Sequence, residues 1–230
     1  MALTDQQAAY VLHSRPYRDT SLLVDFFTLE HGKVPAVVQG ARRPNSKIRA
    51  SVQPFVPIQI AWRGRNELKT LTQAEPVAAM MFLKGDALLC GLYVNELIAR
   101  TLQPFDAHPQ LYVYYQYVLN ELISGNDIQG ALRTFEHRLL NDLGHLPDLS
   151  NKSSDDIYLL NPEQGFVTLS GPPEEKDRMR CFYGWQLLAI SSDNYEDVQV
   201  KRASKRLMRL LIDHLLGYKP LRSRELFQKM

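Results

Sequence analysis

The chain has 230 residues, of which 45% are hydrophobic and 23% charged, and it contains only two cysteines. This composition supports an ordinary hydrophobic core in one or two domains, and it excludes a Cys-rich zinc or disulfide scaffold. No apolar run approaches the ~20 residues that span a bilayer, and no basic region and apolar core of a signal peptide open the chain. We therefore expect a soluble protein of the cytoplasm, with Cys90 and Cys181 as buried free thiols.

Positive charge is strongly segregated along the chain, although the net charge is only +2. Residues 1–80 carry ten Lys or Arg against six Asp or Glu, and residues 198–230 carry nine against two. Residues 81–150 carry four against eight, and residues 151–197 carry four against nine. A basic beginning and a basic end thus flank an acidic middle, and such segregation favours a polyanionic partner.

The first third of the chain predicts an all-β domain. Its apolar and alternating runs predict five short strands, at Ala8–His13, Thr20–Thr28, Val34–Gln39, Val52–Trp62 and Glu67–Ala74. A sheet this small has exposed edges, so closure into a barrel is favoured. Five strands in about 70 residues suggest an OB-fold, while the strand pattern alone leaves an SH3-like or a Tudor-like barrel open.

A basic loop, Gly40–Phe55, joins the third and fourth strands and contains no acidic residue. Further cations follow in the next turn and on the last strand, where barrel topology can bring them to the same face. Spaced cations beside aromatic residues suit the phosphates of a nucleic-acid strand. The candidate DNA-binding residues are Arg42, Arg43, Lys47, Arg49, Arg63, Arg65 and Lys69. Phe55 and Trp62 are candidate stacking residues, although an aromatic side chain on a small barrel usually belongs to the core.

The remaining chain predicts helices. Apolar residues recur with helical spacing over Asp86–Leu102, His108–Ile123 and Asp127–Leu143. Asp86 is expected to be an N-cap, and Gly144 ends the third helix. These three amphipathic helices predict a bundle.

Residues 145–180 are polar and interrupted by four prolines. Ile157–Leu160 and Phe166–Leu169 predict a small β-hairpin there. Two helices are then expected, at Arg180–Ile190 and Val198–Leu216. We predict an α+β multidomain protein, with an OB-fold domain at residues 1–80 and a helical domain at residues 81–230.

The last predicted helix carries a basic face opposite its apolar residues. That face repels itself unless an anion compensates it, so a phosphate backbone or an acidic peptide is a candidate partner. A merely solvated face is the equally open alternative. Its members are Lys201, Arg202, Lys205, Arg206 and Arg209.

Catalytic and metal-binding motifs are absent from the sequence. The six histidines do not cluster, and the patterns GxSxG, GxGxxG, HExxH and CxxC do not occur. Asp155 and Asp156 adjoin each other in a loop, which is more typical of a solvated turn than of a metal site. The sequence therefore predicts no enzyme, no metal and no cofactor.

Taken together, these motifs resemble the RecO family of bacterial recombination mediator proteins over nearly the whole chain. The strongest segment is GARRPNSKIRASVQPF followed by RGRNELKTLTQAE. Weaker segments follow in the family's order: Leu12, Ser14, Arg15, Ser21 and Leu22; Gly91 to Leu97; Leu132, Arg133, Phe135, Glu136, Leu139 and Leu140; and Ser223 to Phe227. One departure stands out, because many members carry four zinc-binding cysteines after the third helix and residues 145–180 here contain none.

The resemblance implies a fold and a function. It implies an N-terminal OB-fold, a helical C-terminal domain and no hydrolytic or redox activity. It also implies binding of single- and double-stranded DNA, annealing of complementary strands, and binding of the acidic C-terminal tail of single-stranded DNA-binding protein. With RecR, and in some settings RecF, such proteins help RecA to load, which implies a location on the nucleoid.

Arg133 matches the arginine with which the family meets that acidic tail. A guanidinium takes a terminal carboxylate bidentately, and the basic residues from Lys201 to Arg209 are expected to meet acidic residues further up the tail. Two rival interpretations remain. One is an RNA-binding or ribosome-associated OB-fold protein, and the other is a nucleic-acid-processing enzyme, which is disfavoured because convergent carboxylates are missing.

Overall fold

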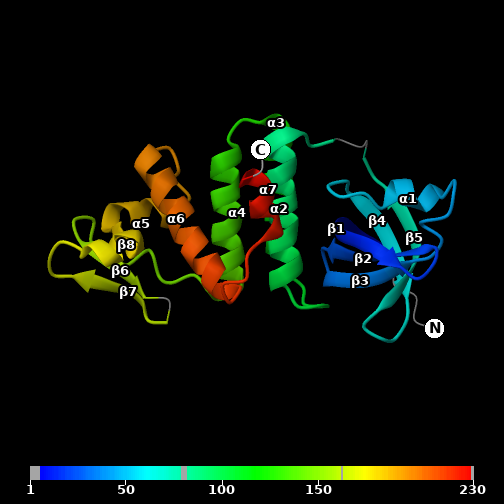
Figure 1. The fold of residues 1–230 in the computed structure, drawn as a ribbon, viewed down its shortest axis with the longest axis horizontal. Coiled ribbons are helices and arrows are strands. Elements are labelled where there is room, and N and C mark those ends of the chain that lie inside the picture. Colours follow the sequence, from blue (N-terminus) through cyan, green and yellow to red (C-terminus); the bar gives the residue numbers. More distant parts are fainter. Residues whose placement is uncertain (1–5, 79–81, 162, 229–230) are drawn as a thin grey trace. The chain divides into compact units, whose positions relative to one another are not determined.

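The computed structural model describes residues 6–78, 82–161 and 163–228 (Figure 1). Contacts divide the chain into two compact units. Unit 1 comprises residues 1–126 and 221–230, and unit 2 comprises residues 127–220. Unit 1 is therefore discontinuous in sequence, and the first two long helices belong with the strands. The predicted boundary between an OB-fold domain, residues 1–80, and a helical domain, residues 81–230, stays a prediction about which segments fold independently.

A closed five-stranded barrel forms the first part of unit 1, as predicted. Its strands are β1 (Gln7–Tyr17), β2 (Ser21–Thr28), β3 (Gly32–Val38), β4 (Ile58–Arg63) and β5 (Lys69–Pro76). Their order is β1-β2-β3-β5-β4, with β4 returning to pair with β1. All pairings are antiparallel except β3 with β5, which meet through two parallel residue pairs. This arrangement is that of an OB-fold barrel.

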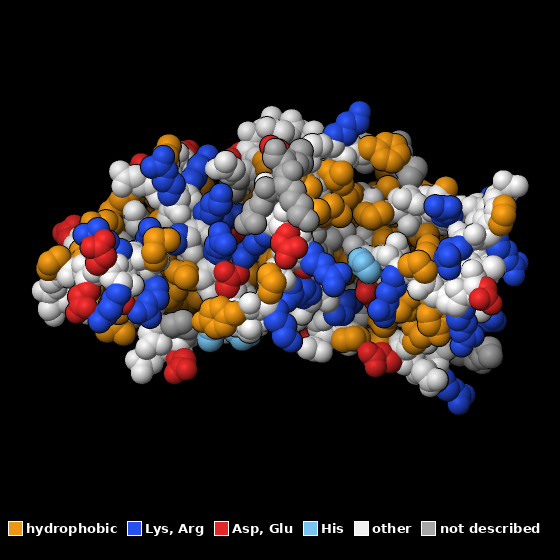
Figure 2. Space-filling model, viewed as in Figure 1, with side chains coloured by type: hydrophobic (Ala, Val, Ile, Leu, Met, Phe, Trp, Pro, Cys, Tyr) orange, Lys and Arg blue, Asp and Glu red, His pale blue; other side chains and the backbone are white. Residues whose placement is uncertain are grey.

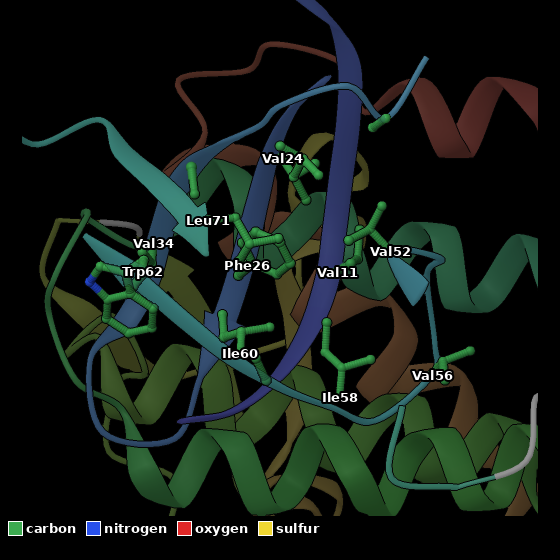
Figure 3. Close-up of a cluster of buried hydrophobic side chains, with 14 residues drawn as sticks. Val11, Val24, Phe26, Val34, Val52, Val56, Ile58, Ile60, Trp62 and Leu71 are labelled. Atoms are coloured by element: carbon green, nitrogen blue, oxygen red, sulfur yellow. The ribbon is translucent and has the colours of Figure 1, made fainter. Parts of the chain in front are cut away.

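The barrel core comes from the inward-facing residues of all five strands (Figure 3). Alternation alone predicts much of it, because side chains of a strand point to opposite faces in turn. The labelled residues with the lowest exposure are Val11, Val24, Phe26, Val34, Ile58 and Ile60. Part of the predicted basic loop is instead a short helix, α1 (Lys47–Ser51). Its Ile48 packs against the core and holds this short helix on the barrel.

Three helices complete unit 1: α2 (Gly85–Thr101), α3 (Pro109–Ser124) and α7 (Arg222–Gln228). The limits of α2 and α3 confirm the predicted ones to within one residue. The prediction that Asp86 caps α2 is wrong, because the N-cap is Lys84 and Asp86 lies inside the first turn. An acidic residue in that turn still interacts favourably with the helix dipole.

The helix α7 was not predicted, and it lies beside α2 (Figure 1). The carboxylate of Glu96 on α2 accepts hydrogen bonds from the backbone N–H groups of Arg222 (3.0 Å) and Ser223 (2.8 Å). It also accepts one from the Ser223 hydroxyl at 2.6 Å. Burial alone raises the pKa of Glu96, but these hydrogen bonds and Arg100 outweigh burial and hold the pKa below its ordinary value. A side chain more than 120 residues away in sequence thus satisfies the donors at the start of α7.

A buried hydrogen-bond network joins the barrel to α2 and α3. The register of β1 with β2 shifts between Val11 and His13. The side-chain amide of Asn95 on α2 donates to the backbone oxygens of Val11 (3.2 Å) and Leu12 (3.0 Å) at this irregularity. The hydroxyl of Tyr115 on α3 donates to Asn95 Oδ1 at 2.7 Å. All four residues are buried, so each of these polar groups needs its partner.

The tripeptide Gln-Pro-Phe occurs twice, and each copy extends the barrel by one isolated parallel bridge. Pro54 pairs with Val11 on β1, and Pro104 pairs with Lys33 on β3. The phenylalanine after each proline has a positive φ, +67° at Phe55 and +62° at Phe105. The chain therefore turns away from the barrel at once, because each left-handed residue ends the extended run.

Unit 2 combines helices with a three-stranded sheet. The helices are α4 (Ile128–Asp142), α5 (Gly184–Ser191), α6 (Val198–Leu215) and a 3₁₀ helix, η1 (Glu175–Arg180). The strands β6 (Ile157–Asn161) and β7 (Gly165–Leu169) confirm the predicted hairpin. A third strand, β8 (Cys181–Tyr183), pairs with β6 and was not predicted. The helix predicted from Arg180 therefore begins only at Gly184.

An ion cluster stabilises the inside of unit 2. His137 Nδ1 lies 2.8 Å from Asp193 Oδ1, and Arg138 pairs with the other carboxylate oxygen. Burial raises the pKa of Asp193, but His137 and Arg138 outweigh burial and hold it below its ordinary value. The two cysteines, Cys90 and Cys181, are buried thiols that form no disulfide, as predicted.

Candidate nucleic-acid interface

An open groove of about 360 Å³ lies at one rim of the barrel. Its walls come from the β1–β2 turn, the end of β3 with the following residues, and the start of β5. Three cations line it, Arg18, Arg43 and Lys69. These residues are far apart in sequence, and the parallel pairing of β3 with β5 brings the last two together. A concave surface with three cations is suited to a phosphate-bearing strand.

Each cation of the groove is positioned by its own local structure. Gly40 has a φ of +69°, and a Cβ there would lie 3.6 Å from Arg43 Cδ, so the Arg43 side chain lies across a bare backbone. Lys69 Nζ donates to the Gly64 oxygen at 3.3 Å and lies 4.6 Å from the centre of the Phe105 ring. Arg18 has a φ of +50°, and its guanidinium lies 5.3 Å from the centre of the Tyr17 ring.

Arg42 fastens the basic loop to the β1–β2 turn. Its backbone N–H donates to the Thr20 oxygen at 2.8 Å. Its guanidinium donates to the backbone oxygens of Arg18 (3.2 Å) and Asp19 (3.4 Å). Arg42 is still exposed, so it lies beside the groove and also holds one wall in place.

The other four barrel cations, Lys47, Arg49, Arg63 and Arg65, are exposed but do not line this groove. The first two lie on α1, the third ends β4, and the fourth follows it. In Figure 2, Lys and Arg side chains appear around the barrel. The structure thus gathers two of the seven predicted DNA-binding cations in the groove and adds one, Arg18, that the sequence analysis missed. Arg18 adjoins Asp19 in a strand turn, so charge counting alone gave no reason to select it.

The two candidate stacking residues pack inside the protein and are not available to stack on a base. Trp62 is only 4% exposed and belongs to the barrel core, so its stacking role is wrong. Phe55 is half-buried, and a Cβ at Gly91 would lie 2.8 Å from its ring, so Phe55 packs against α2 at a glycine. Tyr17, half-buried at the groove, is the aromatic residue that the structure offers in their place.

The basic face predicted on the last long helix is smaller than expected. Arg202, Lys205 and Arg209 on α6 are exposed, and Arg209 contacts Asp213 at 3.7 Å. Lys201 is half-buried and lies 3.6 Å from Asp127.

Arg206 was predicted to belong to this face, and the structure corrects that prediction. Its guanidinium donates to the Cys181 oxygen at 2.6 Å and covers the Phe182 ring at 4.4 Å. Burial lowers the pKa of Arg206. A guanidinium that is bonded to β8 and half-buried supports the sheet instead of meeting an anion.

Arg133 lies on α4 and is held by Glu136. Its Nη2 lies 2.8 Å from Glu136 Oε1, and the two side chains are 12% and 2% exposed. The ion pair fixes the plane of the guanidinium, because an arginine offers its donors in a rigid fork. Arg133 is therefore an oriented group of unit 2 with a small exposed part.

The segment that the resemblance associates with zinc in many relatives, residues 145–180, does not fit that metal here. Residues 145–180 contain no cysteine, and buried Tyr158 and Leu160 form part of a hydrophobic core at this place. Within the ranges that the structure describes, no three His, Cys, Asp or Glu side chains gather as a metal site would require. No described helix is long and apolar enough to cross a membrane.

Comparison with known families and proteins agrees with the geometry. The family model of the recombination protein O N terminal matches residues 1–80, and that of the recombination protein O C terminal matches residues 83–156. The DNA repair protein RecO of Burkholderia pseudomallei is 39% identical over 227 residues, which cover 96% of this chain and 82% of that protein. The DNA repair protein RecO of Pseudoalteromonas atlantica is 40% identical over 237 residues, which cover 98% and 95%. The chain therefore belongs to the RecO family.

Proposed function

We propose that this protein is a non-catalytic mediator of DNA repair and recombination, which binds single- and double-stranded DNA and anneals complementary strands. Membership of a family whose relatives are named DNA repair proteins supports the general role. The observation that carries the DNA-binding part is the groove with Arg18, Arg43 and Lys69 at the barrel rim. The exposed cations on α1 and around the β4–β5 turn do not line the groove but are available for further phosphate contacts.

Binding of a labelled oligo-dT at several salt concentrations tests the groove. Each phosphate contact on a single strand contributes about 0.7 to the slope of log affinity against log salt. Arg18→Gln, Arg43→Gln and Lys69→Gln should each lower affinity and reduce the slope by about that amount. Lys176→Gln is the matched control, because it removes an exposed cation of η1 in unit 2.

Two results would contradict DNA binding by the groove. A slope near zero for the unaltered protein would contradict binding through phosphates. Equal effects of the groove variants and the control would contradict the groove. Competition between single-stranded DNA and RNA of the same sequence separates the proposal from an RNA-binding role, and preference for RNA would favour the latter.

We further propose that unit 2 binds the acidic C-terminal tail of single-stranded DNA-binding protein. Arg133 would take the terminal carboxylate, because its guanidinium is oriented by Glu136. The exposed cations of α6, Arg202, Lys205 and Arg209, would meet the acidic residues that precede it. DNA binding by the barrel and tail binding by unit 2 would then be separate activities.

Anisotropy of a labelled tail peptide tests this separation. Arg133→Ala and Arg133→Lys should both weaken binding, the lysine variant because it keeps the charge and loses the fork. An Arg42→Ala/Arg43→Ala double variant should bind the tail normally and DNA poorly. Equal loss of tail binding in the barrel and Arg133 variants would contradict the division of labour. An amidated peptide should bind unit 2 more weakly than the free acid if the terminal carboxylate is recognised.

The resemblance also supports a place in RecA loading. We propose that the protein acts with RecR, and indirectly with RecF and RecA, on coated single-stranded DNA at the nucleoid in the cytoplasm. RecA filament formation on DNA covered by single-stranded DNA-binding protein, with and without RecR, is the appropriate assay. Acceleration should be lost in Arg43→Gln if DNA binding is required, and an unchanged rate would separate mediation from the groove.

A further inference from the structure

The sheet of unit 2 has two apolar faces, although an antiparallel sheet at a surface usually has one polar face. The inner face carries Tyr158, Leu160 and Phe182, which are 6%, 1% and 1% exposed. The edge-to-face contact of Phe166 with Phe182 belongs to the same face. Unit 2 buries this face on β6 and β8, while on β7 the same face carries half-buried Phe166 and exposed Thr168.

The outer face is fixed by strand register. Ile157 on β6 is opposite Leu169 on β7 and Tyr183 on β8. Leu159 on β6 is opposite Val167 on β7 and Cys181 on β8, and Cys181 is buried. Apart from Cys181, the apolar residues of this face are the other five. Residues opposite one another point to the same side, and these five alternate with the buried inner residues. Val167 is 46% exposed and Tyr183 is 49% exposed, while the other three are half-buried. Figure 2 shows hydrophobic side chains reaching the surface in the region of this sheet.

The strand β7 is an unprotected edge of the sheet. The sheet order is β7-β6-β8, so within the described part of the chain β7 pairs with β6 alone. Natural edges are usually blunted by Lys, Pro or a bulge. The sequence of β7, GFVTL, contains neither Lys nor Pro, and its five residue pairs with β6 run without a register shift. Alternate backbone groups of β7 therefore form a template for a further strand.

Acidic residues lie at both ends of the β6–β7 hairpin. Asp155 and Asp156 precede β6, and Glu163 lies in the turn to β7. All three are exposed, and no ion pair among the described residues involves them. Lys152 Nζ lies 5.4 and 5.7 Å from the ring centres of Tyr158 and Phe166, on the inner face of the hairpin. The cations of η1 pair with carboxylates of their own segment. Lys176, Arg178 and Arg180 face Glu174, Glu175 and Asp177 at 2.8, 3.7 and 2.5 Å.

The acidic residues at both ends of the hairpin indicate which kind of strand can pair with the β7 edge. A second copy pairing edge to edge through β7 would bring further carboxylates to the same interface, and an acidic tail would be repelled by them. A strand with basic ends would be attracted to both ends of the hairpin.

We propose that β7 and the outer face of this sheet bind an extended segment of a partner protein, which adds as a fourth strand beside β7. Alternate residues of the segment are apolar and cover Val167 and Leu169, and Lys or Arg residues flank it. A five-residue strand spans about 17 Å. Such a contact buries less than a stable interface of about 1,200–2,000 Å², so binding is transient.

A designed peptide tests this binding mode with the full chain. The probe is fluorescein-labelled Lys-Lys-Val-Thr-Val-Thr-Val-Lys-Lys, amidated at its end. Three matched peptides carry Glu at the four flanking positions, Ser at those positions, or Pro in place of the central Val, which cannot complete a strand ladder. Fluorescence anisotropy gives the affinities, and hydrogen exchange locates the protected amides. The basic peptide should bind at least about tenfold more tightly than the Glu and Pro peptides, and residues 165–169 should gain protection.

Variants of the chain assign the site. Val167→Lys should abolish binding, because a lysine on an edge strand opposes strand addition. Val113→Lys is the matched control, since Val113 is 56% exposed on α3, and it should leave the affinity unchanged. An Asp155→Asn/Asp156→Asn double variant should bind the Lys-flanked and Ser-flanked peptides with more nearly equal affinity.

Three results would overturn the proposal. They are equal binding of Lys- and Glu-flanked peptides, protection outside residues 165–169, and unchanged binding by Val167→Lys. Self-association of the unaltered chain that is lost in Val167→Lys would also overturn it, because a second copy would then be the occupant.

Discussion

Substitution of Asn95 by alanine should destabilise unit 1 specifically. The side-chain amide donates to two backbone oxygens of β1, at 3.2 and 3.0 Å, and accepts from the Tyr115 hydroxyl at 2.7 Å. Asn95 is 2% exposed and Tyr115 is 0% exposed, so water cannot replace the lost partner. The alanine variant thus leaves a buried hydroxyl without its acceptor and two carbonyls without this donor.

The magnitude follows from the cost of those buried polar groups. Each unsatisfied buried group costs about 1–3 kcal/mol. The three together, with some relaxation, should lower the free energy of unfolding by about 3–5 kcal/mol. Tyr115→Phe keeps the ring contacts with Tyr10 and Phe27 and removes only one hydrogen bond. It should cost about 1–2 kcal/mol, and the two substitutions should be non-additive, because they share that bond.

Urea unfolding in a Trp185→Phe background measures the effect. The chain has two tryptophans, and Trp62 in the barrel core then reports unit 1 alone. The midpoint of the Trp62 fluorescence transition should fall clearly in Asn95→Ala and slightly in Tyr115→Phe. A loss below about 1 kcal/mol in Asn95→Ala, which is less than one unsatisfied buried group costs, would refute the reasoning. A larger loss in Tyr115→Phe than in Asn95→Ala would refute it too.

Three further predictions concern other parts of the fold. In the same unfolding assay, Gly32→Ala should lower the free energy of unfolding by well above the ~1–2 kcal/mol of a left-handed alanine, because the new Cβ would lie 1.6 Å from a backbone oxygen. Gly125→Ala should cost only about that ~1–2 kcal/mol, because nothing lies within 4 Å of its Cβ. The pKa of Glu96 is lowered in the folded state. The ionised carboxylate therefore contributes its full stabilisation of unit 1 above the unfolded-state pKa of about 4.3. That stabilisation is lost as the pH falls through the lower pKa of the folded state. Hydrogen-exchange protection of residues 221–228 should therefore decrease below about pH 4 and should be weak at neutral pH in Glu96→Gln; equal protection in that variant would contradict the role of the carboxylate. Arg206→Ala should lower the thermal midpoint of unit 2 while Arg202→Ala leaves it unchanged, and equal effects would show that the contact with β8 contributes nothing.

Much of the fold could be predicted because local patterns and tertiary structure agree. Alternating apolar residues identify the five barrel strands, and helical spacing gives α2, α3, α4 and α6 nearly to the residue. The elements that were missed depend on distant partners. The three-residue strand β8 exists through its pairing with β6, and α7 is held by Glu96, so neither has a strong local signal.

The candidate site was less predictable, for a related reason. Charge counting finds cations but not the direction of their side chains. Arg43 and Lys69 share a groove because β3 and β5 pair in parallel, which the strand pattern does not reveal. Arg206 fits the basic face of a helical wheel, yet its guanidinium turns to the Cys181 oxygen of a strand that the sequence analysis did not anticipate. Trp62 alternates correctly with Ile60, and that same alternation places it in the core.

The discontinuity of unit 1 has a consequence for biosynthesis. Residues 221–228, which complete unit 1, are synthesised only after the whole of unit 2. At translation rates of about 5–20 residues per second, the synthesis of residues 127–220 takes on the order of 5–20 s. During this interval the barrel, α2 and α3 are already synthesised. Glu96 still lacks its hydrogen-bond donors, the backbone N–H groups of Arg222 and Ser223. Unit 2 can therefore fold before unit 1 is complete, and the last helix to emerge closes the first unit to begin.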